Sequence, residues 1–206
     1  MKKKSLVLKL SMVLFCLLFL TFGCGKRTYI DVTYKIPEKN HALDGQKIFL
    51  EVKDNRSNKN FFNEKAKEKF KYFTGVFSLT TMNENDNKTF EGAFDLQSLF
   101  ETALKKRFES MGVKITPEKS DADLVFQITL YKFDIGRDGR KWESHVSYKA
   151  NLIKDGRIIA KETISGTAER ISIMGSTSSA ETVISDIFTE IINSLNIQGL
   201  FDQAMH

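Results

Sequence analysis

Residues 124–166, LVFQITLYKFDIGRDGRKWESHVSYKANLIKDGRIIAKETISG, contain the pattern that decides the fold. Apolar and polar residues alternate from Leu124 to Gly136 and again from Lys141 to Leu152. This period of two is typical of strands with one buried face and one wet face. Glycine-containing turn sequences at 136–140 and 154–156 separate three such runs. The sequence therefore predicts a three-stranded antiparallel meander.

The second turn of this meander can close in two ways. A two-residue loop, Asp155-Gly156, would place Leu152 opposite Ile159 and Ala150 opposite Lys161. A three-residue loop that also includes Lys154 gives the pairs Leu152–Ile158, Ala150–Ala160 and Val146–Ile164. The longer loop keeps more apolar residues together, so we expect it.

Two segments with helical periodicity flank the meander. The first begins at Asp95, a good N-cap, and ends at Gly112, a good helix stop. The second opens with a capping box, Ser178 and Glu181, and leaves 196–206 as a short tail. Both apolar stripes suit packing on a sheet, and Thr189 is expected on the opposite, exposed side. The stripes are Leu96, Leu99, Phe100, Ala103, Leu104, Phe108 and Met111, and Ala180, Val183, Ile184, Ile187, Phe188, Ile191, Ile192 and Leu195.

Shorter strands are predicted at 28–34, 47–53 and 76–82. The resulting order of strands, helix, meander and helix predicts an α+β, two-layer sandwich. We expect a mainly antiparallel sheet of about four to six strands, with two long helices packed on one face. Residues 24–206 are numerous enough for a single domain with its own core.

The first 24 residues have the form of a bacterial lipoprotein signal. Lysines open the segment, an uncharged apolar run follows from Leu10 to Phe22, and Gly23 precedes Cys24. We therefore predict that 1–23 is a lipoprotein signal peptide and that Cys24 is the lipidation site, carrying palmitate. The lipid would hold a periplasmic domain on the membrane, with the lipoprotein processing and sorting machinery as partners.

The lipobox departs from the usual pattern, because Thr21 stands where leucine is common and Leu20 lies one position earlier. Two alternatives stay open, which are an uncleaved membrane anchor and plain cleaved secretion. The stretch 10–25 is short for a spanning helix, which needs about 20 apolar residues. In enteric-type sorting, an aspartate directly after the acylated cysteine is a signal for the inner membrane. Gly25 occupies this position, so we predict the outer membrane, with the domain facing the periplasm.

Cleavage would change the charge of the chain. It removes four lysines and no acidic residue, so the 31 basic residues become 27 against 26 acidic ones and the net charge falls from +5 to +1. The basic character therefore does not predict a nucleic-acid partner. Gly25, Lys26 and Arg27 would separate Cys24 from the first strand, and five residues span at most about 18 Å. The domain would be held close to the bilayer.

Residues 57–92 are harder to interpret. Phe62, Ala66, Phe70 and Phe73 have helical spacing among lysines, as in a basic amphipathic helix that lies on anionic lipid. The alternative, which we favour, is a surface excursion with its aromatic residues turned onto the core. The polar run 83–87 is expected to form a turn, since the glycine and glutamate positions of a calcium loop are occupied by Lys88 and Phe94.

No catalytic or metal-binding motif is found in the sequence. The three histidines, His41, His145 and His206, have no paired metal spacing, and no cofactor is expected. Cys16 would be removed and Cys24 acylated, so no disulfide is expected. We predict an interaction surface that combines Arg137, Arg140 and Trp142 at a hairpin tip with Phe62 and Phe70. An ordinary solvated hairpin tip is the alternative for the first three.

Several of these features recur in order in one family. The Cys24 lipobox, the strand ending Glu51-Val52-Lys53-Asp54-Asn55-Arg56, the helix from Asp95 to Gly112, the meander and the closing helix 180–195 together resemble the YajG family of bacterial lipoproteins. The resemblance implies an outer-membrane lipoprotein that faces the periplasm, and it supplies no catalytic residues.

We therefore expect a non-catalytic binding or accessory module with an envelope protein partner. The alternatives are a periplasmic hydrolase with a site not visible as a motif, or an uncleaved, membrane-anchored envelope protein.

Overall fold

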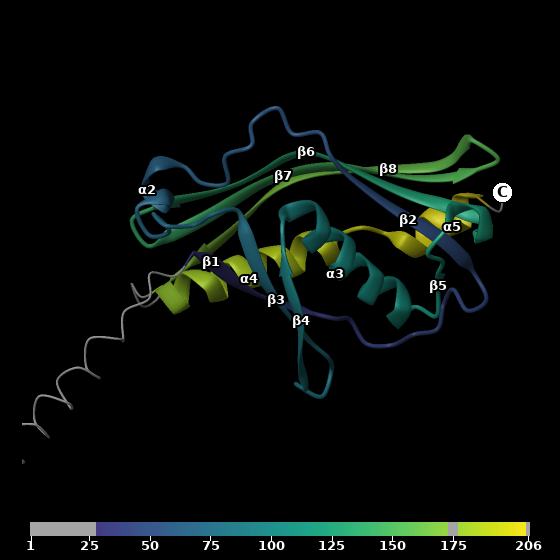
Figure 1. The fold of residues 1–206 in the computed structure, drawn as a ribbon, viewed down its shortest axis with the longest axis horizontal. Helices are drawn as coiled ribbons and strands as arrows, with labels where there is room; N and C mark the ends of the chain where they lie inside the picture. Colours follow the sequence, from purple (N-terminus) through teal and green to yellow (C-terminus); the bar gives the residue numbers. More distant parts are fainter. Residues whose placement is uncertain (1–27, 173–176, 205–206) are drawn as a thin grey trace, which may run out of the picture.

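The computed structural model describes residues 28–172 and 177–204 (Figure 1). The predicted signal peptide and Cys24 lie outside the described residues. The elements are β1 (Tyr29–Lys35), β2 (Lys47–Asp54), α2 (Glu64–Lys67), β3 (Val76–Met82), β4 (Lys88–Phe94), α3 (Leu96–Ser110), β5 (Lys114–Ile115), a 3-10 turn (Lys119–Asp121), β6 (Leu124–Asp138), β7 (Lys141–Lys154), β8 (Arg157–Ile171), α4 (Thr177–Asn193) and α5 (Ile197–Ala204).

The predicted α+β sandwich with two long helices is confirmed, but its strands divide between two sheets. One sheet has three strands in the order β1-β3-β4, and the other has five in the order β5-β2-β6-β7-β8. Helices α3 and α4 and the small sheet lie on the same side of the five-stranded sheet (Figure 1). Strand β4 was not predicted, because its sequence, KTFEGAF, is largely exposed and lacks the alternation of a half-buried strand.

The meander is confirmed as β6, β7 and β8, but the expected register of its second hairpin is wrong. Lys154 pairs with Arg157, so the loop has the two residues Asp155 and Gly156, both with positive φ as a type I′ turn requires. Ile159 then forms a bulge, and Leu152 pairs with Ala160. A bulge moves every later pair by one residue, which alternation alone cannot reveal.

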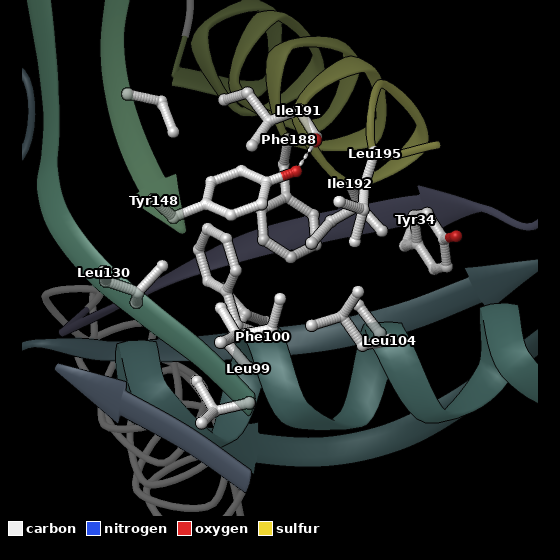
Figure 2. Packing of buried hydrophobic residues seen from close by; sticks show 14 of the residues in the cluster. Tyr34, Leu99, Phe100, Leu104, Leu130, Tyr148, Phe188, Ile191, Ile192 and Leu195 are labelled. Carbon is white, nitrogen blue, oxygen red and sulfur yellow. Dashed lines mark hydrogen bonds between the residues drawn. The ribbon is translucent and has the colours of Figure 1, made fainter. Parts of the chain in front are cut away.

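Large apolar side chains from both long helices meet under the meander (Figure 2). Phe100 of α3 makes edge-to-face contacts with Tyr148 of β7 and Phe188 of α4, at centroid distances of 6.3 and 5.3 Å. The Tyr148 hydroxyl donates a hydrogen bond of 2.9 Å to the carbonyl of Ile191, and burial raises the pKa of Tyr148 to about 12. The neutral phenol therefore stays bonded to α4.

The C-terminal end of α4 is also fixed by a buried arginine. Arg107 of α3 donates to the carbonyl oxygens of Ile192 and Leu195, which belong to the last turn and the exit of α4. Burial lowers the pKa of this guanidinium, yet arginine stays charged in proteins. A cation bonded to terminal carbonyls satisfies groups that a helix leaves without intrahelical partners and opposes its dipole.

Helix α4 lies along the free edge of β1 and bonds to its backbone. The amide of Asp31 donates to the Glu181 carboxylate at 3.2 Å, and the amide of Thr33 donates to the Ser185 hydroxyl at 2.9 Å. Further along, the amide of Lys35 donates to the Thr189 hydroxyl at 3.2 Å, and the Asn193 amide donates to the carbonyl of Lys35 at 3.3 Å. We call Glu181, Ser185, Thr189 and Asn193 the edge stripe.

Three predictions about the C-terminal part of the chain are wrong. Thr189 is half-buried against β1 and does not lie on an exposed side. Helix α4 already includes Ser178, so this residue is not its N-cap, and Glu181 bonds to β1. The expected tail forms α5, because Ile197, Leu200 and Phe201 are buried.

We expect Ile187→Ala to lower the free energy of unfolding by about 2–5 kcal/mol. Ile187 is 1% exposed, so truncation leaves a cavity under the sheet. The exposed helical residue Glu109 is the control, and Glu109→Ala should change stability by less than about 0.5 kcal/mol. Urea unfolding measures both, and equal midpoints for the two variants would show that α4 is not docked on the core.

Ser185→Ala should also destabilise the domain, by about 1–3 kcal/mol, because it leaves the Thr33 amide without its acceptor. Ser98→Ala in α3 is the control, since it makes the same change at a half-buried helical serine. Urea unfolding of the pair isolates the lost bond. If Ser185→Ala is as stable as Ser98→Ala, the stripe does not support β1.

Candidate functional site

The segment between β2 and β3 carries a cluster of aromatic residues. Only Glu64–Lys67 is helical, and the Asn63 side chain caps its N-terminus. The alternative prediction, an amphipathic helix over the whole segment, is therefore wrong. Phe62 stacks on Phe70 at 5.1 Å, Phe70 contacts Trp142 at 6.0 Å, and Phe61 contacts Phe77 at 5.4 Å. The aromatic residues are thus turned toward the core, as the favoured interpretation predicted.

The structure brings most of the predicted interaction residues together, although two of them are buried. Trp142 is 2% exposed and Phe70 is 7% exposed. Phe62 is half-buried, and the Arg137 guanidinium lies 5.8 Å from the centroid of the Trp142 ring. Arg140 is exposed at the tip of the β6–β7 hairpin. A partner could contact the side chains of Arg137 and Arg140 and the accessible part of Phe62. The buried ring of Trp142 packs beneath this surface.

A groove of about 300 Å³ opens beside this cluster. Its walls combine four phenylalanines with charged side chains, and it is lined by Lys59, Asn60, Phe61, Phe62, Glu64, Lys67, Phe70, Lys71, Phe73, Thr74 and Gly75. The amide and hydroxyl of Thr74 donate to the carbonyl of Thr28 at 2.9 and 3.0 Å. The groove therefore lies beside the residue that connects the domain to the predicted anchor.

A buried arginine, not singled out by the sequence, holds the start of this segment. Arg56 is 4% exposed, bonds to the Asp54 carboxylate at 3.0 Å through two nitrogens, and lies 4.8 Å from the centroid of the Phe61 ring. Burial alone would raise the pKa of Asp54, but the Arg56 hydrogen bonds outweigh it and bring the pKa down to about 2. In the sequence, Asp54-Asn55-Arg56 resembles an ordinary turn.

A second and larger groove, of about 630 Å³, runs along one edge of β2. The strand forms one side from Phe49 to Asp54, and the polar residues Gln97, Glu101 and Lys105 of α3 form another. Ile115, Thr116 and Pro117 close one end. Sequence patterns do not reveal this groove, since it depends on which strands are neighbours in the sheet.

A histidine–carboxylate pair among the described residues lies away from both grooves. His145 and Asp134 approach to 3.0 Å on the wet face of β6 and β7, but neither lines either groove described above. Residues 28–172 and 177–204 contain no group of three or more histidine, cysteine, aspartate and glutamate side chains that could hold a metal ion. Within the same ranges, no helix has the length and hydrophobicity needed to span a bilayer.

No family model and no curated protein matches the chain. Among solved structures it is similar to a DUF330-family protein from Xanthomonas campestris, with 16% identity over 85% of this chain and 98% of that one and a TM-score of 0.48. A hypothetical protein from Chlamydia trachomatis matches with 11% identity, 76% and 97% coverage and a TM-score of 0.46. A minor lipoprotein from Acinetobacter baumannii matches with 11% identity, 75% and 91% coverage and a TM-score of 0.35. At TM-scores below 0.5, these matches establish neither a family nor a function.

Asp54→Asn should destabilise the domain in a pH-dependent way. A carboxylate whose pKa is lowered by folding adds stability above its ordinary pKa, near 4, and loses that contribution as the pH falls toward 2. We expect a loss of about 2 kcal/mol at pH 7 that shrinks between pH 4 and 2. Urea unfolding at several pH values measures this, with Asp202→Asn, an exposed carboxylate of α5, as the control. A pH-independent difference would contradict the role assigned to the Asp54–Arg56 pair.

Proposed function

We propose that this protein is a lipid-anchored, non-catalytic binding module of the bacterial cell envelope, attached through Cys24 to the periplasmic face of the outer membrane. The observation that carries the proposal is the position of the 59–75 groove beside Thr28. Three residues, Gly25, Lys26 and Arg27, lie between Cys24 and Thr28, so the Cα atoms of Cys24 and Thr28 are at most about 14 Å apart. An acylated Cys24 would therefore hold this groove at the membrane surface.

The chemistry of the groove suits an anionic surface. Lys59, Lys67 and Lys71 are exposed around it, and the half-buried rings of Phe61, Phe62 and Phe73 line it. Between 59 and 71 there are five lysines and two glutamates, a net charge of +3. A lysine near an anionic lipid surface contributes about 1 kcal/mol, and an acyl chain with a basic patch anchors more firmly than either alone.

The resemblance to the YajG family supports the same location, since that family consists of outer-membrane lipoproteins. The wet face and hairpin tip of the meander, with Arg137 and Arg140, would remain available to an envelope protein partner. A hydrolase remains the competing proposal, with the His145–Asp134 pair as the place to look for it. An uncleaved anchor would keep the same orientation without acylation.

Cys24→Ser should abolish incorporation of labelled palmitate and leave an uncleaved precursor, because the lipoprotein peptidase cuts only after the lipid is attached. Cys16→Ser is the matched control, because it changes the other cysteine of the same segment and should be labelled and cleaved like the wild type. Labelling and gel mobility of the three proteins measure both effects.

Palmitate on the Cys24→Ser protein, or none on the wild type, would remove the anchor from the proposal. The binding role has its own test in crosslinked envelopes. Wild-type protein that recovers nothing beyond the general lipoprotein-sorting machinery would contradict a specific envelope partner.

A further inference from the structure

Strand β2 has an edge that is paired over only part of its length. The amides of Lys114 and Thr116 donate to the carbonyl oxygens of Gln46 and Ile48, so even-numbered residues of β2 direct their backbone groups toward β5. Strand β5 pairs only with Lys47 and Ile48 (Figure 1). The same alternation directs the N–H and C=O groups of Leu50 and Val52 into the 630 Å³ groove, where the described part of the chain offers them no backbone partner.

Other strand edges of the fold are protected by devices that natural sheets use against edge-to-edge pairing. The edge of β1 is bonded to α4. Strands β4 and β8 each carry a bulge, at Glu91 and Ile159. Strand β2 pairs with β6 in unbroken register and has no bulge. Its free edge, from Leu50 to Asp54, is therefore suited to receive another strand.

The geometry of this edge selects one pairing with a second copy. The free segment is centred on Val52, so a twofold axis there pairs Val52 with itself and Leu50 with Asp54 of the other copy, antiparallel. Shifting the pairing toward the start of β2 would place the second strand against Ile48, whose carbonyl already accepts from Thr116. The Asp54 carbonyl, which accepts from Lys59, retains a second lone pair for the new bond.

The charges of the strand fit the same register. Glu51 and Lys53 point to the wet face, where they form an ion pair of 3.1 Å. With the axis at Val52, Glu51 of each copy lies directly opposite Lys53 of the other, at the closely spaced, non-hydrogen-bonded positions of the ladder. A shift by one residue pair in either direction would instead oppose two glutamates or two lysines. Four charges of alternating sign therefore favour this alignment.

We propose that the Leu50–Asp54 edge of β2 is a self-association surface, which joins two copies of this chain into one continuous sheet. Backbone bonds at Leu50, Val52 and Asp54 would provide the pairing, and the Glu51–Lys53 pairs would set the register. The proposal does not depend on acylation of Cys24, so it can fail or hold separately from the proposed function.

Charge exchange tests the register. The full-length chain in detergent should sediment as a dimer, and either Glu51→Lys or Lys53→Glu should weaken dimerisation at least tenfold by placing like charges opposite each other. The double variant Glu51→Lys/Lys53→Glu restores opposite charges and should restore the dimer. A wild type that stays monomeric, single variants that dimerise normally, or a double variant that stays dissociated would each overturn the proposal.

Disulfide trapping provides a second measurement that does not rely on charge. In a background with Cys16 and Cys24 changed to Ser, the double variant Glu51→Cys/Lys53→Cys should form an intermolecular disulfide under mild oxidation, since these positions face each other closely. The matched control Glu51→Cys alone should stay uncrosslinked, because its partner position is Lys53. Crosslinking of the single variant, or none of the double variant, would overturn the register.

Discussion

The backbone amides of Asp31, Thr33 and Lys35 on the outer edge of β1 impose a constraint on the rest of the fold. They need acceptors, and α4 provides them from Glu181, Ser185 and Thr189. The match is geometric. Residues four apart in a helix are spaced about 6.0 Å along its axis, and residues two apart in a strand about 6.6 Å. One row of helix side chains can therefore bond to alternate residues of a strand.

This arrangement fixes both the direction and the rotation of α4. With the edge stripe on β1, the apolar side of the helix faces the meander, where Ile187, Phe188 and Ile191 are buried. Arg107 and Tyr148 then bond to carbonyls at the C-terminal end of α4. Hydrophobic packing stabilises α4 against the meander but has little directionality. The polar contacts along the edge stripe and at the C-terminal end of α4 therefore specify its position.

The predictions from sequence succeeded where the signal was local. The Asp95 N-cap accepts from the Ser98 amide at 2.8 Å, and Gly112 has the positive φ of a helix stop, both within a few residues of their partners. The register of β7 and β8 could not be predicted, because a single bulge at Ile159 changes all later pairs. The role of Arg56 could not be predicted either, since its ring partner and its carbonyl acceptor on Phe133 are set by the tertiary fold.

The two long helices also show why a polar helix face is ambiguous in a sequence. On α4 the polar row includes Ser185, Thr189 and Asn193, whose short side chains bring the helix close enough to bond to a strand edge. On α3 the row is Gln97, Glu101 and Lys105, whose longer side chains line a groove beside β2, with Lys105 and Glu101 paired to each other at 2.7 Å. Short hydroxyl and amide side chains lose little entropy when they are fixed on a backbone, whereas glutamate and lysine lose more and favour solvent. On α4, short polar side chains at a four-residue spacing, together with Glu181, thus accompany a covered strand edge. On α3, a row of longer polar side chains at the same spacing accompanies the open edge of β2.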